Sequence, residues 1–237
     1  MHCTVDAGTS MQTYVTWYNA WLAGAWTRIL YLLCTSVWDG KDRIETYDGL
    51  RNELLLAQTL AVMEVIHAAV GIVRSSAFLT AMQVASRLVV VWAVLQCVPS
   101  SQNAEWVVVH GTLQLNVVSL LLAWSITEII RYTFYMLKEL DALPYMLLWM
   151  RYTAFIVLYP IGVASELVLA WSAWNHATKH GGPSIQMPNA WNFGVDYSTC
   201  ILVFMTAYLY GFPMLYMHMI RQRKKVLSPI SRSKRRS

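Results

Sequence analysis

Long apolar runs separated by short polar segments dominate this chain. They predict helices over residues 13–37, 54–73, 77–98, 106–130, 145–171 and 193–220. About 20 predominantly apolar residues are enough for a helix to cross the hydrocarbon core of a bilayer. Only three residues separate the second run from the third, so these two must form a tight helical hairpin, whereas 174–192 has the Gly, Pro and Asn content of a turn region. The pattern predicts an all-α polytopic membrane protein, a bundle of six transmembrane helices.

The composition excludes an ordinary soluble domain. Hydrophobic residues make up 57% of the chain and charged residues only 13%, against about 45–50% and about 25% in soluble proteins. The 11 Trp and 13 Tyr cluster near the ends of apolar runs, where amphipathic rings favour the membrane interface. We therefore expect a single membrane domain, 1–220, followed by a basic tail, 221–237.

The charge of the tail sets the expected orientation. The net charge of +5 is concentrated in the last seventeen residues, with basic side chains at Arg221, Arg223, Lys224, Lys225, Arg232, Lys234, Arg235 and Arg236. Directly after an apolar run, such a cluster indicates a cytoplasmic anchor rather than a nucleic-acid-binding segment. An even number of spans then places both termini in the cytoplasm. The four cysteines are widely spaced and give no disulfide or zinc framework.

Five ionisable residues fall inside the predicted spans. They are Glu64, His67, Arg87, Glu128 and Glu166. An ionisable group at bilayer depth is costly unless it faces the bundle interior or water, so each is a candidate functional residue. The alternative is a polar pair that only joins helices. For Glu128 this alternative has a specific partner, because Arg131 follows one turn later.

Two patterns resemble metal motifs without completing one. Glu64 and His67 have the Glu-x-x-His spacing of di-iron bundles, but that chemistry needs two such motifs and further glutamates. His176 and His180 have i,i+4 spacing, yet they stand in the segment that we predict to be a loop. We therefore expect no metal and no cofactor.

The fifth run carries the sharpest pair of candidate catalytic residues. Tyr159 and Glu166 are seven residues apart, so on a helix they share a face and lie roughly 10 Å apart along the axis. Pro160 removes a backbone donor and can kink the helix, and Gly162 permits close approach of a neighbour. Both side chains can therefore line one cavity.

At these residues the sequence resembles the very-long-chain (3R)-3-hydroxyacyl-CoA dehydratases, once called protein-tyrosine-phosphatase-like membrane proteins. The similarity covers nearly the whole chain, with motifs at Tyr18-Asn19, 58–71, 73–76, 83–87, 124–132 and 158–166. The resemblance implies a six-span endoplasmic-reticulum enzyme for the third step of fatty-acid elongation, with Tyr159 and Glu166 as its catalytic pair. It also implies a 3-hydroxyacyl-CoA substrate, contact with membrane lipid, and the condensing enzyme and the ketoacyl-CoA and enoyl-CoA reductases as partners. Phosphatase chemistry is excluded, because no cysteine begins a Cys-x5-Arg motif.

The expected reaction needs a base for the C2 proton and an acid for the C3 hydroxyl. We assign Glu166 to C2 and Tyr159 to the leaving oxygen, although exchanged roles, or two transfers by Glu166 with Tyr159 orienting it, fit the sequence equally. Basic residues at the cytoplasmic surface can bind the CoA phosphates, and here the candidates are Arg74, Arg131 and Arg151. Further candidate substrate-binding residues are Glu64, His67, Arg87 and Glu128.

Two other functions are compatible with charged residues in the membrane. A transporter can use intramembrane Glu and His as a proton relay, and it would move a substrate without changing it. A scaffold built on the same helices would need neither Tyr159 nor Glu166. Formation of trans-2-enoyl-CoA from 3-hydroxyacyl-CoA separates the enzyme from both.

Overall fold

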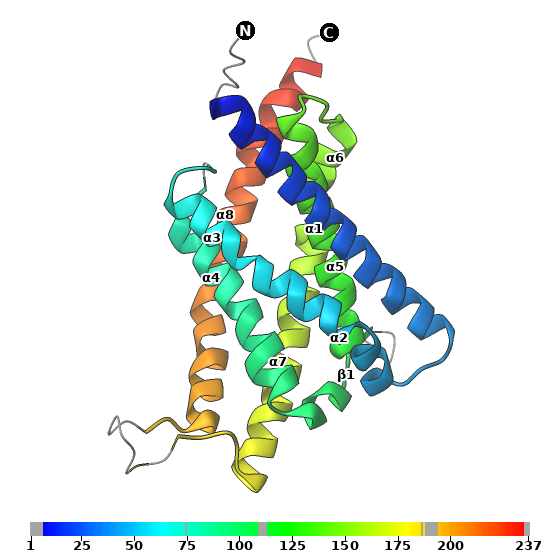
Figure 1. The fold of residues 1–237 in the computed structure, drawn as a ribbon, viewed down its shortest axis with the longest axis vertical. Coiled ribbons are helices and arrows are strands. Elements are labelled where there is room, and N and C mark those ends of the chain that lie inside the picture. Colours follow the sequence, from blue (N-terminus) through cyan, green and yellow to red (C-terminus); the bar gives the residue numbers. More distant parts are fainter. Residues whose placement is uncertain (1–6, 74, 109–112, 186, 188–193, 235–237) are drawn as a thin grey trace, which may run out of the picture.

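The computed structural model describes residues 7–73, 75–108, 113–185, 187 and 194–234, and within these ranges the chain is almost entirely helical (Figure 1). The long elements are α1 (Ala7–Trp38), α2 (Arg43–Leu60), α3 (Val62–Ala69), α4 (Ala77–Leu88), α5 (Val117–Glu139), α7 (Phe155–His180) and α8 (Tyr197–Lys234). The short ones are the π-helical η1 (Val89–Gln96), the 3-10 helix η2 (Pro99–Asn103), α6 (Tyr145–Arg151) and a hairpin of β1 (Trp106–Val108) and β2 (Leu113–Leu115).

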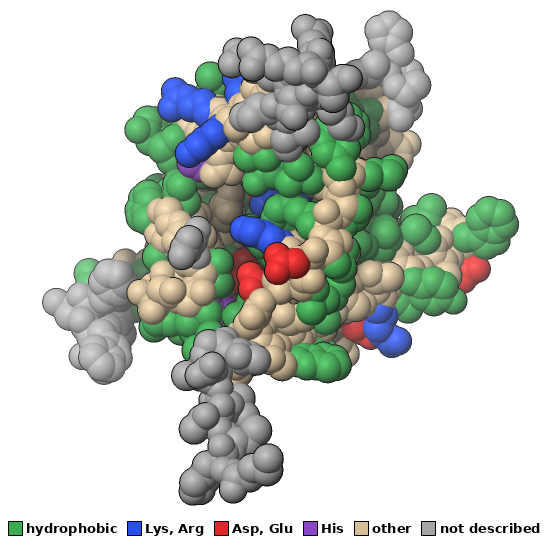
Figure 2. Space-filling view, turned by 90° about the horizontal axis from the view of Figure 1, so that it is seen from above, with side chains coloured by type: hydrophobic (Ala, Val, Ile, Leu, Met, Phe, Trp, Pro, Cys, Tyr) green, Lys and Arg blue, Asp and Glu red, His purple; other side chains and the backbone are tan. Residues whose placement is uncertain are grey.

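The long helices run between the two ends of an elongated bundle. In Figure 1, α1 descends, α2 and α3 return, α4 with η1 descends, α5 rises, α7 descends and α8 rises. As a result, α1 begins and α8 ends at the same end of the molecule. Seen from that end, hydrophobic side chains dominate the perimeter, while acidic and basic side chains meet in the middle of the face (Figure 2).

Five helical segments in the described part of the chain are long and apolar enough to cross a membrane. They are Ser10–Trp38, Ala77–Gln96, Val117–Glu139, Tyr145–His180 and Tyr197–Ser228. This confirms a polytopic, mainly helical membrane protein. The predicted second run, 54–73, corresponds to the end of α2 with α3 and is not among the five, because α2 begins with a charged stretch that contains Arg43, Glu45 and Asp48.

The core forms where α1 and α7 pack on opposite sides of α5. Leu22, Trp26 and Ile29 of α1 are almost fully buried, as are Leu120 and Leu121 of α5. Many large apolar residues outside this core are exposed, which is expected of surfaces that face lipid rather than water. Helix α5 is therefore the central element that holds the site described below.

The predicted helix over 106–130 is wrong in its first eleven residues. These residues form β1, β2 and their connection, of which 109–112 lie outside the described part of the chain. Helix α5 begins at Val117 because Asn116 caps it: its side-chain oxygen accepts hydrogen bonds from Val118 N (2.9 Å) and Ser119 N (3.1 Å). A polar cap satisfies backbone donors that would otherwise lack partners at a helix start.

The fifth and sixth predicted helices also have different limits. The fifth is interrupted between α6 and α7, and α7 continues to His180, so placing His176 and His180 in a loop is wrong. Burial of Ala173 and Ala177 stabilises these extra turns, and α7 ends before Gly181, which has a positive φ of 77°. Helix α8 continues beyond residue 220 to Lys234, and the last three residues of the basic tail lie outside the described part.

The start of α8 is fixed by a side-chain cap. Asp196 accepts hydrogen bonds from the Ser198 hydroxyl (2.5 Å) and from Thr199 N (2.8 Å). These donors stabilise the carboxylate and lower the pKa of Asp196 to about 2. Asp196 therefore stays ionised at neutral pH, at the helix N-terminus where a negative charge is favourable.

Candidate active site

Glu166 lies at the centre of the site on α7, with only 6% of its surface exposed. Trp124 of α5 donates its indole N–H to Glu166 Oε1 at 2.9 Å. Tyr208 of α8 donates its hydroxyl to Glu166 Oε2. Helices on both sides of α7 therefore hold this one carboxylate, each through a neutral donor.

Close packing of α7 on α5 makes the contact with Trp124 possible. A Cβ atom added to Gly162 would lie 3.9 Å from Ala123 Cβ and 4.0 Å from Trp124 Cδ1. One turn further along, the hydroxyls of Ser165 and Ser119 are 2.8 Å apart. The expectation that Gly162 faces a close neighbour is confirmed, although a methyl group there would make only ordinary van der Waals contact.

Tyr159 lies on the same face of α7 as Glu166, and its ring also contacts α8. Its ring stacks on Phe212, with centroids 5.3 Å apart and planes 8° apart, and on Tyr216 at 6.2 Å and 11°. No residue in the described ranges forms a hydrogen bond with the Tyr159 hydroxyl. Stacking therefore orients the Tyr159 ring, while its hydroxyl has no hydrogen-bond partner in the described ranges.

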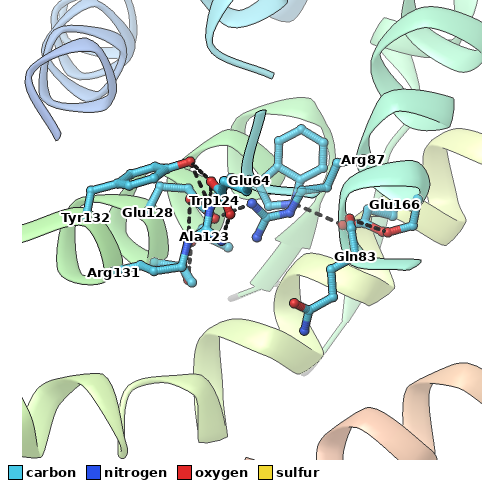
Figure 3. Close-up of polar contacts among 11 residues, drawn as sticks. Glu64, Gln83, Arg87, Ala123, Trp124, Glu128, Arg131, Tyr132 and Glu166 are labelled. Atoms are coloured by element: carbon cyan, nitrogen blue, oxygen red, sulfur yellow. Dashed lines mark hydrogen bonds and ion pairs between the residues drawn. The ribbon is translucent and has the colours of Figure 1, made fainter. Parts of the chain in front are cut away.

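A buried ion-pair network occupies the space beside this pair (Figure 3). Arg131 donates two hydrogen bonds to Glu64, at 2.7 and 2.8 Å, and two to Glu128, at 2.9 and 2.5 Å. Arg87 forms an ion pair with the other oxygen of Glu128, and the Tyr132 hydroxyl donates to Glu64. The network joins α3, α4 and α5, so Arg87 and Glu128 form an ion pair between helices.

The charges of the network balance, which separates it from Glu166. Glu64 and Glu128 supply two carboxylates, and Arg87 and Arg131 supply two guanidinium groups. None of the ion pairs among the described residues includes Glu166. Glu166 is therefore the buried carboxylate here that has hydrogen-bond donors but no cationic partner.

Arg87 connects the network to the pair on α7. Its guanidinium carbon lies 5.6 Å from the centroid of the Trp124 ring, within the range of a cation–π contact. Trp124 in turn donates to Glu166, so the network reaches the α7 carboxylate through this ring.

The other predicted site residues lie elsewhere. His67 is buried between the edges of Tyr14 and Tyr18, and its Nε2 is 3.0 Å from the Tyr14 hydroxyl. It borders an open pocket of about 470 Å³ between α1 and α3, outside the ion-pair network. Arg151 ends α6 with its guanidinium carbon 5.9 Å from the ring of Tyr135. Arg74 lies outside the described residues.

No metal site is evident where the chain is described. Glu64 is engaged by Arg131 and Tyr132, and no group of three or more His, Cys, Asp or Glu side chains in the described ranges is arranged to hold an ion. His176 and His180 lie close on α7, with ring centroids 4.8 Å apart, and Ser100 contacts His176 at 3.1 Å. This histidine pair lies one to two helical turns beyond Ala173, at the end of α7 remote from Tyr159.

Sequence reasoning missed Trp124 and Tyr208 as site residues. The sequence could have indicated Trp124, because its i,i+4 and i,i+7 spacing to Glu128 and Arg131 places all three on one face of a helix. The sequence could not have indicated Tyr208, because Tyr210 stands two residues away in an equally apolar context and the two cannot be told apart. Only tertiary packing places one of these tyrosines inside and leaves the other 76% exposed.

Comparison with known proteins gives consistent matches over nearly the whole chain. A model of the family "Protein tyrosine phosphatase-like protein, PTPLA" matches residues 58–229. The chain is 39% identical to the very-long-chain (3R)-3-hydroxyacyl-CoA dehydratase hpo-8 of Caenorhabditis elegans, covering 95% of this chain and 99% of that protein. It is 38% identical to the dehydratase PASTICCINO 2 of Arabidopsis thaliana (93% and 96% covered) and 39% identical to human dehydratase 2 (91% and 81% covered). No solved structure matches the chain.

Proposed function

The chain belongs to the protein tyrosine phosphatase-like (PTPLA) family, and we propose that Glu166 and Tyr159 perform the dehydration for which its relatives are named. Similarity over nearly the full length identifies the chain as a very-long-chain (3R)-3-hydroxyacyl-CoA dehydratase, a hydro-lyase of fatty-acid elongation. Such an enzyme removes water across C2 and C3 of its substrate and leaves a trans-2-enoyl-CoA.

One observation supports the assignment most strongly. Glu166 is a buried carboxylate that forms no ion pair among the described residues, and it shares a helix face with Tyr159, whose hydroxyl has no hydrogen bond there. A carboxylate neutralised by an arginine, such as Glu128, is a weaker base than one that has only neutral donors. The geometry therefore favours Glu166 over the two carboxylates of the network as the base.

We assign the steps of the reaction accordingly. Glu166 takes the proton from C2, the electron pair of that C–H bond forms the C2–C3 double bond, and the C3–O bond breaks. Tyr159 gives a proton to the departing oxygen, which leaves as water. The proton on Glu166 then returns to Tyr159 through solvent, so the enzyme regains its starting state and no cofactor is consumed.

Arg87 has a separate task in this proposal. Removal of the C2 proton places negative charge on the thioester carbonyl oxygen, and a preorganised cation stabilises such charge in a water-poor site. Arg87 lies against the ring of Trp124, which donates to Glu166, and 21% of its own side chain is exposed. Arg131 has its guanidinium engaged by Glu64 and Glu128, so we assign it to the network and not to the CoA phosphates.

We propose that α2 and α3 together form the sixth crossing. They run from residue 43 to residue 69, which is roughly 40 Å of helix and enough to span a bilayer. Their return path in Figure 1 lets α1 begin and α8 end on one side. We infer that this side is cytoplasmic, because basic residues follow the apolar part of α8, and that the membrane is the endoplasmic reticulum.

The substrate would then enter from the cytoplasmic end. Helix α7 starts near that end, so Tyr159 is met before Glu166 along the path of the substrate (Figure 1). We retain Arg151, and Arg74 outside the described ranges, as ligands of the CoA phosphates. Association with the other elongation enzymes follows only from the activity, and we keep it as a proposal.

The activity has a direct test. Purified protein incubated with a (3R)-3-hydroxyacyl-CoA should produce trans-2-enoyl-CoA, which absorbs in the ultraviolet because the double bond is conjugated with the thioester. The (3S) enantiomer is the matched control and should react far more slowly. Uptake of the substrate into proteoliposomes without conversion would instead favour a transporter.

Replacing Tyr159 by phenylalanine should lower kcat by about 10²–10⁴-fold, the usual contribution of a positioned acid. The ring and its stacking on Phe212 and Tyr216 persist, so the protein should remain folded. The matched control is Tyr210→Phe on the exposed side of α8, which should leave turnover unchanged. Wild-type turnover by Tyr159→Phe would reduce Tyr159 to a packing residue.

The length of the acyl chain should affect KM. If the reacting carbons lie between Tyr159 and Glu166, the acyl chain beyond C3 must lie in an apolar groove. Candidates for the walls of this groove are Phe155 and Val163, which are buried, and Leu167, which is half-buried. Ile156, a fourth candidate, is 39% exposed. Burial is worth about 0.8 kcal/mol per methylene, so KM should fall by up to roughly fourfold per added carbon until the groove is full.

This series is measured with 3-hydroxyacyl-CoA substrates of increasing length below their micelle-forming concentrations. The change should appear in KM and not in kcat, because the groove binds the substrate and the transition state equally. A KM that is independent of length would place the site at the aqueous surface.

A further inference from the structure

The carboxylate of Glu166 is held from two sides, and the partner on α8 has no role in the reaction as written above. Tyr208 donates its hydroxyl to Oε2 and Trp124 donates its indole N–H to Oε1. We propose that Tyr208 is a positioning residue that fixes the orientation of the Glu166 carboxylate for removal of the C2 proton. This inference rests on the proposed role of Glu166 as the base.

Two donors accomplish what one cannot. A glutamate side chain has three rotatable bonds, and a single hydrogen bond to one oxygen would still let the carboxylate turn about that contact. Donors to both oxygens, from opposite helices, define the plane of the carboxylate. Each ionised oxygen has about two lone-pair sites, so each keeps one site after its hydrogen bond. The free sites can then face one fixed position of the bound substrate, as efficient proton transfer requires.

Tyr208 is itself well placed to hold this geometry. Its ring packs edge-on against Phe204, with centroids 5.0 Å apart and planes 74° apart. Its hydroxyl links α8 to Glu166 of α7. A supporting residue of an active site needs such a fixed conformation of its own.

The two tyrosines beside Glu166 have different environments, which separates their tasks. The Tyr208 hydroxyl is engaged by the carboxylate, whereas the described residues leave the Tyr159 hydroxyl without a hydrogen bond. A group that donates to the base is not free to protonate the leaving oxygen. Tyr208 thus acts through Glu166, and Tyr159 remains the group that meets the substrate.

The test is Tyr208→Phe, which removes the hydroxyl and keeps the ring. We expect kcat to fall by about 10- to 100-fold, because a small misplacement of a reacting group has an effect of this size. KM should change less than twofold, since Tyr208 does not touch the substrate. The matched control is Tyr210→Phe, two residues away on the exposed face of the same helix, with normal kcat.

Two further readouts distinguish positioning from packing. Substrate deuterated at C2 should show a larger isotope effect on kcat/KM in Tyr208→Phe than in the wild type, because proton removal becomes slower relative to the other steps. Incorporation of 4-aminophenylalanine at position 208 restores a donor at nearly the same place and should recover most of kcat. If Tyr208 only filled space, Tyr208→Phe and the 4-aminophenylalanine variant would have the same kcat.

Each outcome decides the inference. A kcat within twofold of wild type in Tyr208→Phe, while Glu166→Gln is inactive, would overturn the role of Tyr208 and leave the proposed base intact. Activity in Glu166→Gln would overturn the proposed base itself. If Tyr208→Phe is not recovered folded, 4-fluorophenylalanine at position 208 fills most of the volume of the hydroxyl but supplies no donor. An unchanged kcat there would overturn the inference, and a fall of tenfold or more would support it.

Discussion

Glu166→Gln is expected to lower turnover by about 10²–10⁴-fold or more, the contribution of a positioned general base. The amide has the size of the carboxylate but cannot accept the C2 proton. The fold should persist, because the Tyr208 hydroxyl can turn from donating to accepting and so satisfy the new amide N–H. The measurement is the rate of trans-2-enoyl-CoA formation per folded enzyme, with folding checked by gel filtration in detergent.

A second glutamate provides the matched control. Glu53 on α2 forms a partly exposed ion pair with Arg28 at 3.2 Å, remote from the site. The same change there, Glu53→Gln, should leave turnover at the wild-type level. Turnover above one tenth of wild type in Glu166→Gln would refute the assignment of Glu166 as the base.

Arg131→Met should destabilise the protein by about 3–5 kcal/mol, the usual cost of removing one partner from a buried ion pair. Arg131 engages both Glu64 and Glu128, and Glu128 is fully buried. Methionine fills much of the volume but leaves two carboxylates facing each other with Arg87 as the remaining cation of the network. Thermal unfolding in detergent measures the loss.

Arg28→Met is the control for this effect. The Arg28 side chain is 65% exposed, and pairs of that kind contribute about 0–1 kcal/mol. Glu64→Gln introduced together with Arg131→Met should recover part of the stability, because it removes one of the uncompensated charges. If Arg131→Met unfolds no earlier than Arg28→Met, the network does not stabilise the bundle.

The membrane class and the placement of Tyr159 and Glu166 on one helix face could be predicted from the sequence because each depends on local information. An apolar run of bilayer length must be helical in lipid, whatever its neighbours are. A tyrosine and a glutamate seven residues apart share a face of any helix, so Tyr159 and Glu166 could be paired without knowing the rest of the bundle. One ion pair of the network could also be predicted from the sequence, because Arg131 follows Glu128 by one helical turn.

The limits of the helices depended on tertiary context. The start of α5 moved to Val117 because Asn116 caps the helix, while the apolar residues before it paired as strands. The end of α7 moved to His180 because Ala173 and Ala177 are buried by neighbouring helices. In both places the periodicity of the hydrophobic run does not by itself determine whether the segment forms a helix, a strand or a turn.

The surroundings of Glu166 were decided by tertiary structure alone. The sequence determines that a carboxylate lies in an apolar helix, but not whether a cation or a neutral donor will meet it. Packing of the helices pairs Arg87 and Arg131 with the carboxylates of Glu64 and Glu128. Glu166 instead accepts hydrogen bonds from two neutral donors, Trp124 and Tyr208. Tyr208 and Tyr210 are equivalent in the sequence, yet successive side chains of a helix point in different directions, and only the position of α8 against α7 turns Tyr208 inward.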